Sequence, residues 1–119
     1  MEISRRFFQL SQEDIDGIIF NNATELWFCD LSKEKMEKLR DEDVISIIDN
    51  HVKADEIKEI DLDGCVGITD TAITHIATNC TQLRTLYVSR CDQITDHGIK
   101  AIVEKIGNKL TRLGYDNNS

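Results

Sequence analysis

The sequence predicts an α/β protein in which short parallel strands alternate with helices. The segments "IKEIDLDGCVGITDTAITHIA" (57–77) and "LRTLYVSRCDQITDHGIKAIV" (83–103) share one layout at an offset of 26 residues. Within each segment the spacing of apolar residues changes from two to three and four, as it does where a strand gives way to a helix. Strands joined through an intervening helix run parallel. Stacked units of this kind form a short right-handed solenoid with strands on its concave face and helices on its convex face.

Residues 1–22 are expected to cover the N-terminal end of the array, since an end unit must not leave its apolar core open. Phe8 and Leu10 alternate as in a strand, and Ser11 stands where a helix would begin. Three isoleucines continue from it at helical spacing: Ile15, Ile18 and Ile19. Because 119 residues hold one modest core, this segment and the array are predicted to form a single domain, residues 1–119.

The first unit is predicted over residues 23–56. Leu26 and Phe28 take strand positions, and Leu31 takes the place that cysteine holds in the later units. The helix positions follow an insertion of five residues and are Leu39, Val44 and Ile47. The insertion leaves two alternatives for residues 32–43, which form either an extra helical turn or a loop.

Two further complete units are predicted over residues 57–82 and 83–109, and residues 110–119 begin a truncated fourth. Thr69 and Thr95 stand at helix N-cap positions. Each is followed by an aspartate in the first helical turn, where the helix dipole favours negative charge. The four strands are expected to be centred on Trp27, Asp61, Tyr87 and the segment 113–115.

The pattern Leu-x-x-Leu-x-Leu-x-x-Cys-x-x-Ile-Thr-Asp is present as "IKEIDLDGCVGITD" and "LRTLYVSRCDQITD". It resembles the cysteine-containing leucine-rich repeat found in F-box substrate receptors and in bacterial effectors that imitate host proteins. Residues 57–115 carry the resemblance, residues 23–56 follow it less regularly, and residues 1–22 do not match. An F-box does not fit, because the chain has no proline for its Leu-Pro pair and too few residues before Ala23.

The cysteines are expected to be structural and reduced. Cys65 and Cys91 occupy equivalent inward-turning places, and Cys80 takes a position that the resembled family fills with a buried cysteine; a free thiol behaves there as a small hydrophobe. Cys29 is expected to be accessible, two residues beyond Trp27. The cysteines are separated by 36, 15 and 11 residues, which does not fit the paired short spacings of a zinc site.

No catalytic residues, metal or cofactor are predicted. The three histidines occupy different places in their units, and none is paired in the sequence with a serine or cysteine nucleophile. They are His51, His75 and His97.

The strand side chains that point to solvent form the candidate binding face. The first two units contribute Glu25, Trp27, Cys29, Glu59, Asp61 and Asp63. The third unit and the truncated fourth contribute Thr85, Tyr87, Ser89, Arg112, Gly114 and Asp116.

Trp27 and Tyr87 are the predicted anchors of this face, because Trp and Tyr most often anchor protein interfaces. An acidic surround is expected from Glu25, Glu59, Asp61 and Asp63, with Thr85, Ser89, Arg112 and Asp116 completing the partner-binding set. For Trp27 a second interpretation stays open, in which the indole folds over the N-terminal segment instead.

The charge balance indicates the class of partner. Fourteen basic and 22 acidic residues give a net charge of -8, which argues against nucleic acid and anionic membrane and favours a protein with a basic patch. No stretch approaches the ~20 apolar residues of a membrane span, and the first residues do not resemble a signal peptide. A cytoplasmic protein, monomeric when free, is expected.

Recognition is the predicted function, because a row of strands presents a rigid face without a closed pocket for chemistry. The main hypothesis is a non-catalytic module that binds one protein through its concave face, as an adaptor or as an inhibitor of a partner enzyme. An alternative is a bacterial effector, or an antagonist of one, in a host cytosol. A remote alternative is the substrate-recognition part of a ubiquitin ligase without its F-box.

Overall fold

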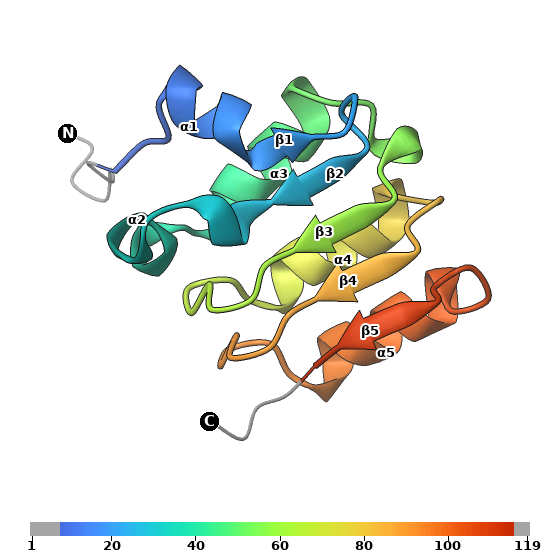
Figure 1. Ribbon diagram of the computed structural model, residues 1–119. Coiled ribbons are helices and arrows are strands. Elements are labelled where there is room, and N and C mark those ends of the chain that lie inside the picture. The colour runs from blue at the N-terminus through green and yellow to red at the C-terminus, as the bar shows by residue number, and fades with distance from the viewer. Residues whose placement is uncertain (1–7, 116–119) are drawn as a thin grey trace, which may run out of the picture.

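The sheet organises the fold. The computed structural model describes residues 8–115 and contains five strands in the order β1-β2-β3-β4-β5 (Figure 1). β1 is antiparallel to β2, and all later neighbours are parallel. The strands are β1 (Ile19–Phe20), β2 (Glu25–Trp27), β3 (Glu59–Asp61), β4 (Thr85–Tyr87) and β5 (Arg112–Gly114). The predicted α/β class with a mostly parallel sheet is confirmed.

Helices accompany the strands in each unit. The α-helices within residues 8–115 are α1 (Gln12–Ile18), α2 (Lys33–Lys38), α3 (Asp41–Asn50), α4 (Asp70–Asn79) and α5 (Asp96–Ile106). Two 3-10 turns, η1 (Phe28–Asp30) and η2 (Ala54–Glu56), complete the set.

The strand register follows the offsets between the sequence units. Leu26 lies beside Ile60, Ile60 beside Leu86, and Leu86 beside Leu113. These steps of 34, 26 and 27 residues are the ones at which the apolar pattern repeats. The predicted parallel pairing of the second and third units is therefore confirmed.

The predicted strand centres were one residue too late. The strands are centred on Leu26, Ile60, Leu86 and Leu113, because the backbone leaves the sheet soon after Trp27, Asp61 and Tyr87. Phe28 begins a 3-10 turn, and the chain bends beyond β3 and β4 at two left-handed residues, Gly64 (φ 82°) and Arg90 (φ 60°). Each of the four parallel strands therefore has three residues rather than a longer alternating run.

The two faces of the sheet have different surroundings. The side chains of Leu26, Ile60 and Leu86 are fully buried, toward the face on which α3, α4 and α5 lie in Figure 1. Their neighbours along each strand are half-buried and point to the other face, which no helix covers in the figure. A parallel sheet is usually covered on both faces, so this uncovered face distinguishes the molecule.

Polar contacts join each helix to the next. The Thr69 and Thr95 hydroxyls cap α4 and α5 as predicted, each accepting from a backbone N–H in the first turn at 3.2 Å. The Asp41 carboxylate accepts hydrogen bonds from the backbone N–H and hydroxyl of Thr69, and Asp70 does the same for Thr95. The first-turn aspartate of one helix thus holds the N-cap of the next.

Residues 32–43 fold as helix rather than loop. Ser32 caps α2 by accepting a hydrogen bond from the Lys35 backbone N–H at 3.3 Å, and α3 begins after a short break at Leu39 and Arg40. The side chain of Leu39 is fully buried, which anchors this break in the core.

At the N-terminal end, the predicted strand over Phe8 and Leu10 is wrong, although both side chains pack against the core. The strand lies instead at Ile19–Phe20, because a tight turn brings these residues antiparallel to β2. The helix predicted after Ser11 is present as α1.

Candidate functional site

The uncovered face of the sheet, which we call the strand face, is the candidate site. The register places Glu25, Glu59, Thr85 and Arg112 in one row and Trp27, Asp61, Tyr87 and Gly114 in the next. Neighbouring side chains in a row stand about 4.8 Å apart across the strands. The structure thus brings eight of the twelve predicted face positions together on the strands. Cys29, Asp63 and Ser89 lie just beyond the strand ends, and Asp116 lies outside the described residues.

Trp27 is half-buried at the N-terminal side of this face. Its ring stacks on Phe20 of β1 with centroids 4.5 Å apart and planes inclined by 34°. The indole N–H is buried and has no hydrogen-bond partner of acceptable geometry among residues 8–115. The stacking supports the second interpretation of Trp27, in which the indole folds over the N-terminal segment.

Tyr87 lies toward the opposite side, over β5. A Cβ atom on Gly114 would stand 2.7 Å from a Tyr87 ring carbon, so the ring occupies space that only glycine leaves open. Arg112 donates a hydrogen bond to the Tyr87 hydroxyl at 3.4 Å. The two rings are therefore drawn toward opposite edges of the sheet, and the acidic side chains of β3 lie between them.

Like charges face each other in the row beside the two rings. Glu25 and Glu59 are directly opposed on neighbouring strands, an arrangement that destabilises a sheet. Burial raises the pKa of Glu59 above its usual 4.5, and the charges of Glu25 and Asp61 raise it further. Arg112, two strands away, offsets this only in part. Among residues 8–115, no cation forms an ion pair with either member of this acidic pair.

Asp63 and Ser89 support the turns at the strand ends. The Asp63 carboxylate accepts a hydrogen bond from the Ser89 backbone N–H at 2.6 Å. Burial nevertheless raises the pKa of Asp63 above its usual value, because it outweighs that hydrogen bond. The Asp63 backbone N–H in turn donates to the Asp61 carboxylate at 3.0 Å. These two residues therefore fix the rim of the face.

Cys29 lies in η1 beside the acidic side chains, half-buried rather than open. Burial is the main cause that raises its pKa to about 12, and the nearby Asp61 carboxylate adds to it. The thiol is thus protonated at neutral pH and is a poor nucleophile.

The remaining cysteines are buried and free, as predicted: Cys65, Cys80 and Cys91. The Cys91 thiol donates a hydrogen bond to the Leu62 carbonyl at 3.0 Å, which connects its unit to the turn of the preceding one. Burial raises the pKa of both Cys80 and Cys91 to about 12. These thiols behave as core side chains.

Of the histidines, His75 makes a side-chain contact with an acid. Its Nε2 lies 2.8 Å from the Asp49 carboxylate and joins α4 to α3 on the helical side. This pair is separated from the strand face by the sheet (Figure 1).

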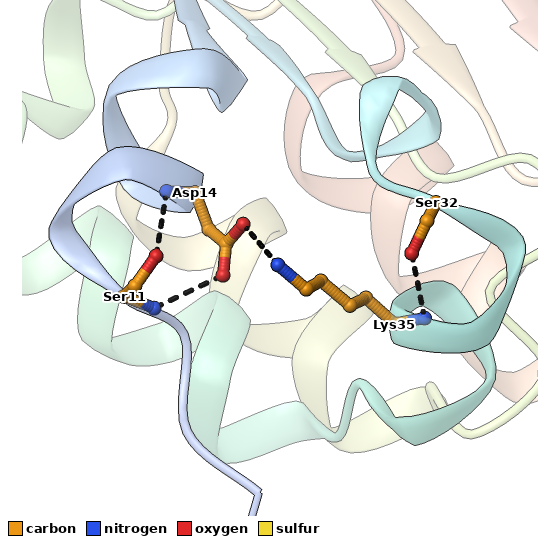
Figure 2. A network of polar contacts seen from close by, with 4 residues as sticks. All are labelled: Ser11, Asp14, Ser32 and Lys35. Carbon is orange, nitrogen blue, oxygen red and sulfur yellow. Dashed lines mark hydrogen bonds and ion pairs between the residues drawn. The ribbon is translucent and has the colours of Figure 1, made fainter.

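A second polar cluster lies between α1 and α2 (Figure 2). Asp14 accepts hydrogen bonds from the Ser11 backbone N–H at 3.1 Å and from the Lys35 ammonium at 2.7 Å. The bond to Lys35 lowers the pKa of Asp14 despite burial, and Asp14 raises the pKa of Lys35. A hollow of about 340 Å³ adjoins the cluster. The ion pair between Asp14 and Lys35 joins α1 to α2, and we call this cluster the N-terminal tether.

Sequence reasoning missed two residues that support the face. Phe20 provides the surface on which Trp27 stacks, and the Asn21 side chain donates a hydrogen bond to the Glu25 carboxylate at 3.0 Å. The signal was present in "IIFNNATELW", where an Asn-Asn turn separates two apolar runs as in a hairpin.

No model of a known protein family matches the chain. Within residues 8–115, no helix combines the length and apolar character that a membrane crossing requires. The same residues contain no group of three or more His, Cys, Asp or Glu side chains arranged to hold a metal ion.

Proposed function

We propose that the chain is a non-catalytic protein-binding module of the leucine-rich-repeat type, and that its uncovered strand face binds a partner with a basic surface. The single observation that carries this proposal is the pair of directly opposed, half-buried glutamates, Glu25 and Glu59, in the row beside the one that holds Trp27 and Tyr87. Such an arrangement costs stability. A basic side chain from a partner would relieve it.

The chemistry of the face fits recognition better than catalysis. The thiol nearest to it, Cys29, has its pKa raised to about 12, which works against a nucleophilic role. The aromatic and acidic side chains stand on short strands fixed by their register. A rigid face of this kind binds with little loss of side-chain entropy.

The test is site-specific photocrosslinking from the strand face. A photoreactive residue at Thr85, in the middle of the face, should capture a basic protein from cell extract, with a yield that falls as salt rises. The same residue at Lys100, on α5, is the matched control. Equal capture from both positions would contradict a strand-face site.

The isolated partner then allows the anchors to be measured. Tyr87→Ala should weaken binding by about 2 kcal/mol or more, because it removes a large rigid contact. Trp27→Ala should weaken it as well, and Phe20→Ala controls for the loss of the Trp27 stacking contact. Full binding by folded Tyr87→Ala and Trp27→Ala variants would place the site elsewhere. Adding the chain to an activity assay of a captured enzyme distinguishes an inhibitor from an adaptor.

A further inference from the structure

The repeated architecture allows each unit to be compared with the next, and the comparison singles out the outer side of α5 and β5. Val103 occupies the position that Ala77 holds one unit earlier, yet Val103 is 53% exposed and Ala77 only 2%. Ile73 and Leu86 are likewise fully buried, whereas their equivalents Ile99 and Leu113 are only partly buried. Within residues 8–115, no further unit covers the positions that a following unit covers elsewhere. We call this surface the β5 edge; its apolar members are Ile99, Val103, Leu110, Leu113 and Tyr115.

Polar groups of the β5 edge also lack, within residues 8–115, the partners that their equivalents have in the preceding units. β5 ends the sheet within residues 8–115, so one side of its backbone has no strand beside it. Asp41 and Asp70 each hold the N-cap threonine of the next helix. Asp96 has the same position in α5, but no described residue donates to it in this way. An edge with these features favours pairing with another chain.

The charges at the two ends of the β5 edge indicate which kind of partner fits it. Asp92 and Asp96 lie at the end where α5 begins, and the Tyr115 hydroxyl, 3.5 Å from the Ile94 carbonyl, shows that β5 finishes at this same end. The opposite end, where α5 finishes and β5 begins, carries three cations against one acid, Glu104: the cations are Lys105, Lys109 and Arg112. The edge is therefore acidic at one end and basic at the other.

We propose that two copies of this chain associate through their β5 edges about a two-fold axis, with the two β5 strands antiparallel. A two-fold axis makes an interface self-complementary. It places the acidic end of each copy against the basic end of the other, and it brings the two Val103 side chains to the same seam. This association is independent of the strand face, which stays open for a different partner.

The first experiment measures mass against concentration by sedimentation equilibrium. Three strand residues make a small interface, so association should be weak and visible at high concentration. The mass of the full chain should rise from 13.6 kDa toward twice that value. Val103→Asp should stay at the monomer mass, and circular dichroism should show it folded, because the side chain is already exposed. Val66→Asp, at a valine 37% exposed elsewhere, is the matched control and should associate normally.

The second experiment tests the orientation through charge. The variant Asp92→Lys/Asp96→Lys has a basic edge and the variant Lys105→Glu/Lys109→Glu an acidic one, so each alone should remain monomeric. An equimolar mixture should form the dimer, more strongly at low salt. The proposal is overturned if the unmodified chain is monomeric at all concentrations, if Val103→Asp associates normally, or if mixing has no effect. Loss of association in Trp27→Ala would also overturn it, since that residue lies on β2, at the other side of the sheet from β5.

Discussion

At the scale of single residues, equivalent cysteines have different surroundings. The Cys91 thiol donates to the Leu62 carbonyl, and a serine hydroxyl could keep that bond. Cys65 is fully buried among apolar side chains, and burial raises the pKa of its thiol. A hydroxyl at position 65 would therefore be buried without an obvious partner, which is costly.

We expect Cys65→Ser to lower the free energy of unfolding by about 1 to 3 kcal/mol. Cys91→Ser should cost less because its acceptor is retained, and Cys65→Ala should also be milder because it buries no polar group. Urea unfolding in reducing buffer measures all three, with half-buried Cys29→Ser as the control. A larger cost for Cys91→Ser than for Cys65→Ser would contradict the assigned hydrogen bond.

At the scale of elements, the aspartate–threonine contacts connect successive helices. Asp70 accepts from both the backbone N–H and the hydroxyl of Thr95, so its carboxylate caps a helix that is not its own. Charge-assisted bonds of this type are stronger than neutral ones, but this pair is exposed to solvent. Its contribution should therefore resemble that of an ordinary N-cap.

A double-mutant cycle with Asp70→Ala and Thr95→Ala should give a coupling free energy of about 1 kcal/mol. Asp96→Ala, at the same place in α5, should change stability less, since it loses only its interaction with the helix dipole. Thermal unfolding of dilute samples provides the values. Additive effects of Asp70→Ala and Thr95→Ala would show that the contact does not stabilise the stack.

The sequence predicted the elements whose pattern is repeated. Comparing "IKEIDLDGC" with "LRTLYVSRC" was enough to align Ile60 with Leu86, because a one-residue slip would turn every buried side chain outward. The N-terminal strand has no second copy for comparison. Phe8 and Leu10 alternate as in a strand, whereas the adjacent Ile19 and Phe20 do not, and only pairing with β2 identifies Ile19–Phe20 as the strand.

The sequence predicted where the candidate face lies but not which residues its side chains contact. Alternation along the strands placed Trp27 and Tyr87 on one side of the sheet. The ring directions depend on Phe20 and Gly114, which come from other strands. Likewise the position of Cys29 near the acidic residues followed from the repeat, whereas its partial burial depends on the 3-10 turn that carries it.

At the scale of the whole molecule, the acidic excess behind the net charge of -8 includes carboxylates whose ionisation opposes folding. Glu59 and Asp63 both have raised pKa values in the folded state. A carboxyl with a raised folded pKa binds protons more readily when folded, so stability falls as the pH rises through that pKa. Asp14 has the opposite shift, and its contribution is lost as the pH falls through its lowered pKa. The strand face and the N-terminal tether therefore respond to acid in opposite directions.

We expect Glu59→Gln to raise the free energy of unfolding at pH 7 by up to about 0.5 kcal/mol, because it removes one of two directly opposed charges. The gain should disappear below pH 4.5, the usual pKa of the group, where the glutamate is protonated in both folded and unfolded chains. Urea unfolding at pH 7 and pH 4 measures the difference, with the exposed Glu56→Gln as control. The same substitution should slow association with a basic partner, since that carboxylate attracts it. A loss of stability at pH 7 would mean that the Glu59 carboxylate supports the sheet, and the strand face would then lose the main argument for its role in binding.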